Sequence, residues 1–265
     1  MNDNSSVSAK GRGMLEVRAV SKRFSGATAV AGVSLCVAAG EIAGLIGPNG
    51  AGKTTLFNMI AGSLVPSSGE IFLEGSRITG EKAHRRMARG MGRTFQIARP
   101  FPEMTLLDNL LTAAQGQTGE HVFANWLRPG RVAREERANT EKAMSLLEFL
   151  GLARLARDPA RVLSGGQRKL LELGRVMMAD PRIILLDEPG AGVNPALLDT
   201  IIGRIAEINK RGVTILVIEH NMDLVARLCR HVFVMSAGAM LFEGTPAAVL
   251  DEPAVIDAYL GGGLR

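Results

Sequence analysis

The chain has 265 residues, 46% of them hydrophobic, which is enough to bury the core of one large domain or of one domain with an inserted lobe. No apolar run approaches the roughly 20 residues of a membrane-spanning helix, and residues 1–13 lack the apolar core of a signal peptide. We therefore expect a cytoplasmic chain with a disordered tail over residues 1–13. The net charge of +5 suits nucleic acid, a nucleotide or an anionic membrane, so charge alone does not choose between them.

Two kinds of strand are predicted in chain order. Residues 15–20 and 33–37 alternate between apolar and polar side chains, as in strands with one face in solvent. Residues 42–46, 183–186 and 213–218 are apolar almost throughout, which is typical of strands in a parallel sheet covered by helices on both faces. Helical patterns separate these runs, so we predict an α/β core.

A phosphate-binding loop follows the first buried strand. Residues 47–54 fit the pattern G-x-x-x-x-G-K-[ST], and the helix-forming segment 56–61 comes next. Its glycines let backbone N–H groups point at phosphate oxygens; Lys53 is expected to reach the β- and γ-phosphates, and the Thr54 hydroxyl to bind Mg²⁺. Such a loop alone also fits kinases, GTPases and helicases. The candidate ATP-binding residues here are Gly47, Pro48, Asn49, Gly50, Ala51, Gly52, Lys53, Thr54 and Thr55.

The middle of the chain has a different character. Five arginines between residues 85 and 99 form its densest positive region, which we interpret as a solvated face: Arg85, Arg86, Arg89, Arg93 and Arg99. From residue 100 to 180 no strand pattern occurs, and apolar side chains recur at helical spacing between residues 143 and 150. We infer a helical lobe inserted between two halves of the α/β core.

Residues 163–167 read Leu-Ser-Gly-Gly-Gln and precede a helical pattern. Serine is a favoured N-cap, so Ser164 is predicted to cap the helix that follows. The same geometry presents a hydroxyl and backbone N–H groups to an anion. This segment is therefore a candidate for contact with a second anion.

The apolar run 183–186 leads directly into Asp187 and Glu188. Buried charges are costly unless they are paired or bind metal, so two carboxylates at the end of a buried strand need a reason. In a P-loop ATPase the Asp at this position holds Mg²⁺, directly or through water. Glu188 is then placed to polarise the attacking water as general base.

These three motifs occur in the order and at the spacings of ATP-binding-cassette (ABC) ATPases, and the chain resembles that family over a single domain from about residue 14 to 261. The resemblance implies an α/β fold, a P-loop NTPase (RecA-like) core with a small antiparallel β region and an inserted helical subdomain. The implied divisions are a core over 14–99 and 160–245, a helical insert over 100–160, a C-terminal helix over 246–261 and a tail over 262–265.

The resemblance also assigns roles to residues. Family members pack head to tail, so that each ATP lies between the phosphate loop of one chain and the signature of the other. The implied signature, acting on the partner's ATP, is Leu163, Ser164, Gly165, Gly166 and Gln167. Phe24 matches an aromatic residue that stacks on adenine, Gln96 a glutamine that contacts Mg²⁺ and the attacking water, and His220 a histidine that contacts the γ-phosphate.

The loop after Glu188 departs from the commonest family pattern. This loop contains Gly192 and Asn194 and is expected to contact the opposite subunit. Most ABC ATPases have Asp where Asn194 stands; Asn keeps the hydrogen bonds but loses the charge.

Several segments resemble the ATPases of branched-chain amino acid importers, among them residues 191–195, 92–96, 218–223 and 243–246. The segment around Gln96 is similar to the LivG-type subunit rather than its LivF-type companion. The resemblance implies ATP and Mg²⁺ as cofactors and a peripheral place on the cytoplasmic face of the inner membrane.

The partners implied are a second ABC ATPase (LivF-type, or a second copy when isolated), two membrane permease subunits and, indirectly, a periplasmic solute-binding protein. No nucleic acid is expected.

The sequence leaves several other functions open. The ATPase of lipopolysaccharide export and those of urea or amide importers are close alternatives, because an ATPase chain does not touch the transported solute. ABC ATPases that act on nucleic acid or the ribosome form a different class. Translation factors of this class carry two cassettes in one chain, and its DNA-repair members insert a long coiled coil or a large domain. This chain has one cassette and no sustained heptads.

Overall fold

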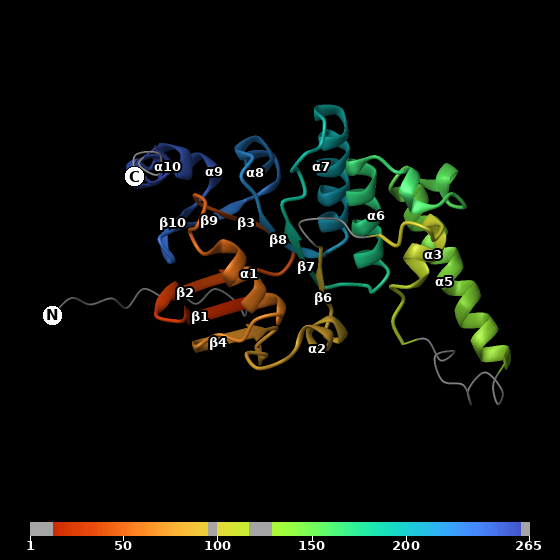
Figure 1. Cartoon of the computed structure of the whole chain (residues 1–265), viewed down its shortest axis with the longest axis horizontal. Helices are drawn as coiled ribbons and strands as arrows, with labels where there is room; N and C mark the ends of the chain where they lie inside the picture. The colour runs from red at the N-terminus through yellow and green to blue at the C-terminus, as the bar shows by residue number, and fades with distance from the viewer. Residues whose placement is uncertain (1–12, 95–99, 117–128, 261–265) are drawn as a thin grey trace.

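The computed structural model describes residues 13–94, 100–116 and 129–260 (Figure 1). Its strands are β1 (Leu15–Phe24), β2 (Ala27–Val37), β3 (Ile42–Ile46), β4 (Ser68–Leu73), β5 (Ser76–Arg77), β6 (Met91–Arg93), β7 (Ile183–Asp187), β8 (Thr214–Ile218), β9 (His231–Ser236) and β10 (Ala239–Gly244). Its α-helices are α1 (Lys53–Ala61), α2 (Ala83–Ala88), α3 (Leu106–Leu111), α5 (Pro129–Phe149), α6 (Gly165–Met177), α7 (Pro195–Lys210), α8 (Met222–Leu228), α9 (Pro246–Asp251) and α10 (Pro253–Leu260). Short 3₁₀ turns, η2 (Ala153–Leu155) and η3 (Ala160–Val162), join α5 to α6.

The predicted α/β fold is confirmed. A six-stranded sheet has the order β10-β9-β3-β8-β7-β6 and is parallel except for β10, and a four-stranded antiparallel sheet has the order β2-β1-β4-β5. Figure 1 shows the antiparallel sheet at one end of the molecule and helices α3, α5 and α6 at the other. The parallel strands lie between them.

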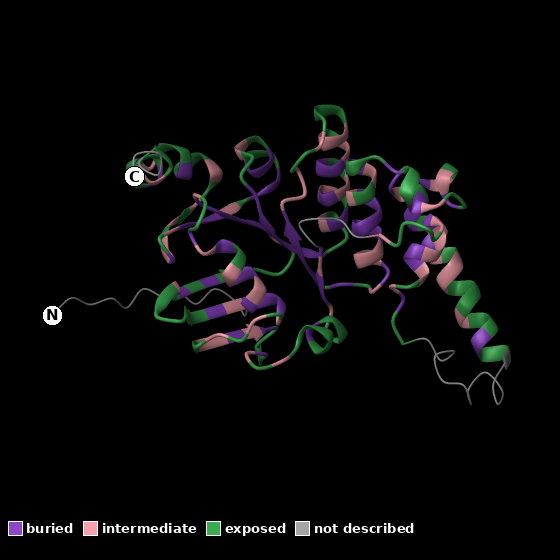
Figure 2. Ribbon diagram, viewed as in Figure 1, coloured by how far each residue is buried: buried purple, intermediate pink, exposed green. Residues whose placement is uncertain are grey.

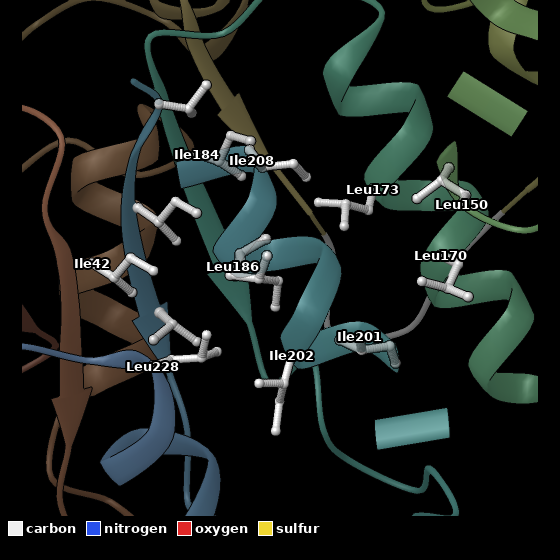
Figure 3. Packing of buried hydrophobic residues seen from close by; sticks show 14 of the residues in the cluster. Ile42, Leu150, Leu170, Leu173, Ile184, Leu186, Ile201, Ile202, Ile208 and Leu228 are labelled. Carbon is white, nitrogen blue, oxygen red and sulfur yellow. The ribbon is translucent and has the colours of Figure 1, made fainter. Parts of the chain in front are cut away.

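The side chains of each central strand alternate between two hydrophobic clusters, one on each face of the parallel sheet. Ile184 and Leu186 of β7 belong to the cluster that includes α6, α7 and α8, part of which Figure 3 shows. Ile183 and Leu185 point the other way, into the cluster that includes α1 and the antiparallel sheet. The continuous apolar pattern follows from this burial on both faces, which is visible as the purple strands of Figure 2.

The predicted helical region is also observed. Helices α3, α5 and α6 contact one another, and in the described residues from 100 to 180 the only β pairing is an isolated bridge between Thr105 and Pro159. Leu150, the residue that follows α5, packs closely on α6, since a Cβ at Gly174 would lie 2.7 Å from a Leu150 methyl group. Among the described residues, no helix is both long and apolar enough to cross a bilayer.

The expected single C-terminal helix over residues 246–261 is wrong in detail. Helix α9 ends at Asp251 and α10 begins at Pro253. The residue before a proline is disfavoured in the helical conformation, and Glu252 has φ −79° and ψ 114°. The chain therefore turns at Glu252, which lets two short helices pack in place of one.

The arginine-rich region is not simply a solvated face. Arg85 is exposed, but Arg86 is only 1% exposed and belongs to the buried interior. Its guanidinium donates to five carbonyl oxygens, those of Met59, Ile60, Ile78, Thr79 and Glu81, at 2.5–3.1 Å. Two of these carbonyls lie at the C-terminal end of α1, where a positive charge is favourable. Burial lowers the pKa of Arg86 to about 10, with the Glu81 carboxylate opposing the change. Arg99 lies outside the described residues.

Candidate functional site

Three loops meet at one edge of the central sheet. Strands β3, β8 and β7 are parallel neighbours, so their carboxyl ends lie together. The phosphate loop follows β3, His220 comes two residues after β8, Asp187 ends β7 and Glu188 follows it. In open α/β sheets, ligands bind beyond the carboxyl ends of the strands. The structure thus gathers most of the predicted site residues at the edge where a ligand is expected.

The backbone conformation of the phosphate loop requires glycine at three positions, and a close contact excludes a side chain at one of them. Gly47, Gly50 and Gly52 have φ values of 144°, 79° and 93°, which side chains rarely adopt. A Cβ at Gly47 would lie 2.1 Å from the Met235 carbonyl oxygen, whereas one at Gly50 would meet no atom within 4 Å. Of the loop residues, Asn49, Gly50 and Thr54 are exposed and Lys53 is buried.

We expect Gly47→Ala to lower the free energy of unfolding by about 3 kcal/mol, because it adds a clash with backbone to a left-handed conformation. Gly50→Ala has only the conformational term and is expected to cost about 1–2 kcal/mol. Urea unfolding of both variants measures the difference. Equal losses of stability in the two variants would contradict the conclusion that the nearby Met235 carbonyl oxygen excludes a side chain at Gly47.

Lys53 folds back over its own loop. Its Nζ donates to the carbonyl oxygens of Gly47 and Pro48 at 2.7 and 2.9 Å. Burial lowers the pKa of Lys53, and the Glu188 carboxylate opposes this change. A partly desolvated ammonium group that donates to two neutral carbonyls is well placed to exchange them for phosphate oxygens.

Asp187 is buried at the end of β7, 6% exposed. Burial raises its pKa, the Arg93 guanidinium lowers it in part, and the Glu188 carboxylate raises it again. Arg93 Nη2 lies 3.5 Å from Asp187 Oδ2, and the Asp187 N–H donates to Thr94 Oγ1 at 3.2 Å. A carboxylate in this environment is stabilised by any cation that reaches it.

Glu188 and His220 are brought together from two strands. His220 Nε2 lies 3.0 Å from Glu188 Oε1, at hydrogen-bonding distance. Glu188 has a φ of 48°, a left-handed conformation that costs a non-glycine residue about 1–2 kcal/mol. Strain of this kind concentrates at functional sites, where the surrounding structure holds it in place.

Glu219 is a residue whose role sequence reasoning missed. It is 2% exposed, and its carboxylate accepts hydrogen bonds from the backbone N–H groups of Gly190, His220 and Asn221 at 2.6, 3.0 and 3.3 Å. Glu219 therefore clamps the loop after β7 to the loop after β8. The sequence did contain an indication of this role, because Glu219 directly follows a buried apolar strand, just as Asp187 ends one.

The signature segment begins α6. Ser164 caps the helix as predicted: its side chain accepts from the Gln167 N–H at 3.3 Å, and the Gln167 side chain accepts from the Ser164 N–H at 3.0 Å. Leu163 is buried, whereas Ser164 and Gly165 are exposed. The two glycines differ, because a Cβ at Gly166 would lie 2.2 Å from a Leu197 methyl carbon and one at Gly165 would meet nothing.

Asn194 has a structural role of its own. It is the N-cap of α7, and its Oδ1 accepts from the Leu197 N–H at 2.9 Å. Asp is an equally good N-cap, so the cap does not require Asn. Gly192 has a φ of 67°, and a Cβ there would meet no atom within 4 Å; both residues are exposed.

Phe24 is 46% exposed at the end of β1, so it is not a core residue. Lys22 Nζ lies 5.3 Å from its ring centre. The hairpin that carries Phe24 adjoins the phosphate loop, because a Cβ at Gly52 would lie 2.5 Å from the Ala29 carbonyl oxygen. Gln96 lies outside the described residues.

Comparison with known proteins fits this geometry. Residues 30–191 match the ABC transporter family, and the chain belongs to that family. It is an ATP-binding cassette, an ATPase subunit of a transport complex. Residues 239–264 further match the family described as branched-chain amino acid ATP-binding cassette transporter.

Two curated relatives are each 42% identical. The probable branched-chain amino acid transport ATP-binding protein LivG of Archaeoglobus fulgidus aligns over 94% of this chain and 95% of its own. The high-affinity branched-chain amino acid transport ATP-binding protein BraF of Pseudomonas aeruginosa aligns over 94% of this chain and 98% of its own length. A crystal structure of a nucleotide-free ATP-binding cassette from an ABC transporter superposes with a TM-score of 0.81 at 37% identity, covering 92% of this chain and 98% of that one.

Proposed function

We propose that the chain hydrolyses ATP within a pair of cassettes and thereby drives the import of branched-chain amino acids. The observation that carries the hydrolytic part is the Glu188–His220 pair at 3.0 Å beside the phosphate loop. The solute is proposed because curated relatives about 40% identical along nearly the whole chain are named for branched-chain amino acid transport.

The chemistry follows from the positions of the side chains. Lys53 exchanges its two loop carbonyls for oxygens of the β- and γ-phosphates. Glu188 accepts a proton from the attacking water, and His220, hydrogen-bonded to it, holds the γ-phosphate on the same side. Phe24 stacks on the adenine ring.

Magnesium is proposed at the same edge because the donor set suits a hard cation. Asp187 is a buried carboxylate with a raised pKa, and Thr54 offers an exposed hydroxyl in the first turn of α1. When bound, Mg²⁺ neutralises charge on the phosphates. Gln96 is the third proposed ligand.

The signature is proposed to act on the ATP of a second cassette. Ser164 and Gly165 are exposed at the start of α6, where a capped helix offers N–H groups to an anion. Gly192 and Asn194 are exposed in the loop before α7 and are proposed to contact the partner. The partner is a LivF-type subunit in the transporter, or a second copy when the chain is isolated.

A surface for the membrane subunits is proposed on the described residues that follow the segment of Gln96 in the sequence. Phe101, Met104 and Val162 are 48%, 36% and 55% exposed. The Ala160 N–H donates to the Met104 carbonyl at 2.9 Å, so the two segments that carry these side chains lie side by side. Apolar side chains grouped on a surface are typical of interaction sites, here for a helix of the membrane subunit.

We expect Met104→Asp to reduce the co-purification of membrane subunits at least tenfold while ATP binding by the isolated chain stays unchanged, because a charge in an apolar contact must be desolvated. Val65→Asp is the matched control, since Val65 is 60% exposed in the loop after α1. Equal loss of co-purification in both variants would contradict the proposed docking surface.

The test of the whole proposal is a pull-down of the tagged chain from membranes, followed by uptake of labelled leucine. We expect recovery of a second ABC ATPase and two multi-span subunits, and loss of leucine uptake when the chain is deleted. Recovery of only further copies of the chain with export-type membrane subunits would refute import, as would unchanged uptake.

A further inference from the structure

A lysine in α6 reaches the backbone of the proposed catalytic residue. Lys169 Nζ donates to the Glu188 carbonyl oxygen at 2.6 Å. The Lys169 side chain is half-buried and borders a small cavity of about 20 Å³ whose lining also includes Asp187 and Pro189. Burial lowers the pKa of Lys169, and four carboxylates oppose this change, those of Glu219, Glu188, Glu172 and Asp187.

The Glu188 backbone needs such a restraint. Its φ of 48° is unfavourable for a residue with a side chain. On one side the Glu188 N–H donates to the Ile218 carbonyl of β8 at 3.0 Å. On the other side its carbonyl accepts from Lys169 of α6 and from the Ala191 N–H at 3.2 Å, so the residue is held between the central sheet and α6.

Helix α6 also carries the signature. Ser164 caps it, and Lys169 lies five residues further along the same helix. Gly166, between them, packs so tightly on Leu197 of α7 that a Cβ would not fit. A displacement of the signature therefore moves the Lys169 ammonium group, because a helix of this length behaves as a rigid body.

We propose that Lys169 is a positioning residue that ties the catalytic carboxylate of one ATP site to the signature helix serving the other. The inference rests on the proposed roles of Glu188 and Ser164. When Ser164 engages the partner's nucleotide, α6 is held in place, and Lys169 keeps the Glu188 peptide in the conformation that directs its carboxylate at the water.

The test compares Lys169→Met, Lys169→Arg and Lys142→Met in the full chain. Lys142 is the matched control, because its Nζ donates to the Met178 carbonyl at the other end of α6, at 2.9 Å. We expect Lys169→Met to lower kcat about 10- to 100-fold with the KM for ATP within about threefold of the original, since small misplacements of catalytic groups have effects of this size. We expect its ATP-induced dimer to persist longer, because hydrolysis opens it.

Lys169→Arg should restore most of kcat, and Lys142→Met should change neither kcat nor dimer lifetime. Turnover of Lys169→Met at the original rate overturns the inference. A second outcome also overturns it: Lys169→Met loses kcat, binds ATP more weakly and melts at a lower temperature, and Lys169→Arg does not restore kcat. That pattern describes a purely structural lysine. Glu188→Gln in the same assays separates the two claims: original turnover there would remove Glu188 from its proposed role as general base, and the inference would fall with that role, whereas a loss of turnover in Glu188→Gln but not in Lys169→Met would overturn the inference alone.

Discussion

Glu188→Gln is expected to lower kcat for ATP hydrolysis by about 10²- to 10⁴-fold, which corresponds to about 3–5 kcal/mol of activation free energy. Glutamine keeps the shape of the side chain and a hydrogen bond to His220, 3.0 Å away, but cannot accept the proton of the attacking water. ATP binding should be retained, because Lys53 and the loop backbone are unchanged. Steady-state phosphate release and size-exclusion chromatography with ATP measure the two effects, and an ATP-stabilised dimer is expected.

A second glutamate near a histidine provides the control. Glu243 Oε2 lies 3.9 Å from His231 Nε2 on the hairpin of β9 and β10. Glu243→Gln should hydrolyse ATP at the original rate, because this pair does not follow β7 or β8. If Glu188→Gln also retained the original rate, Glu188 would not be the general base.

Arg86→Met is expected to have the largest effect on stability, a loss of about 3–5 kcal/mol in the free energy of unfolding. Methionine fills much of the volume but donates no hydrogen bond, so carbonyl oxygens of α1 and of the segment after β5 lose their donor. Each buried polar group left unsatisfied costs about 1–3 kcal/mol, and local rearrangement recovers part of the sum. For a chain of this size we expect the melting temperature to fall by roughly 10 °C.

Arg85→Met is the matched control, one residue earlier on the same helix. Arg85 is exposed, and surface substitutions usually change stability by less than about 0.5 kcal/mol. Thermal and urea unfolding of both variants should therefore separate them clearly. Similar small losses would mean that water or other side chains replace the Arg86 contacts.

Much of the fold could be predicted from local pattern. The runs that became β3, β7 and β8 are buried on both faces, and their composition requires helices on each side. The phosphate loop was predictable because glycine, lysine and threonine at fixed spacing leave few alternative functions. Helix N-caps at Ser164 and Asn194 are equally local, since each side chain bonds to an N–H three residues later.

Contacts between distant segments could not be predicted in this way. The break at Glu252 was visible as a proline, but the choice between two packed helices and one depends on the surface that they cover. The pairing of Glu188 with His220 depends on β7 and β8 becoming neighbours, which only the folded sheet decides.

The sequence by itself therefore determined the class of fold, the phosphate loop, the two carboxylates and the family, because these depend on residue type and spacing along the chain. The tertiary structure alone decided that Arg86 is a buried donor while Arg85 is solvated, since five carbonyls from separate segments converge on one side chain. It also decided that Lys169 reaches Glu188, because that bond joins two elements whose approach is set by packing rather than by local propensity.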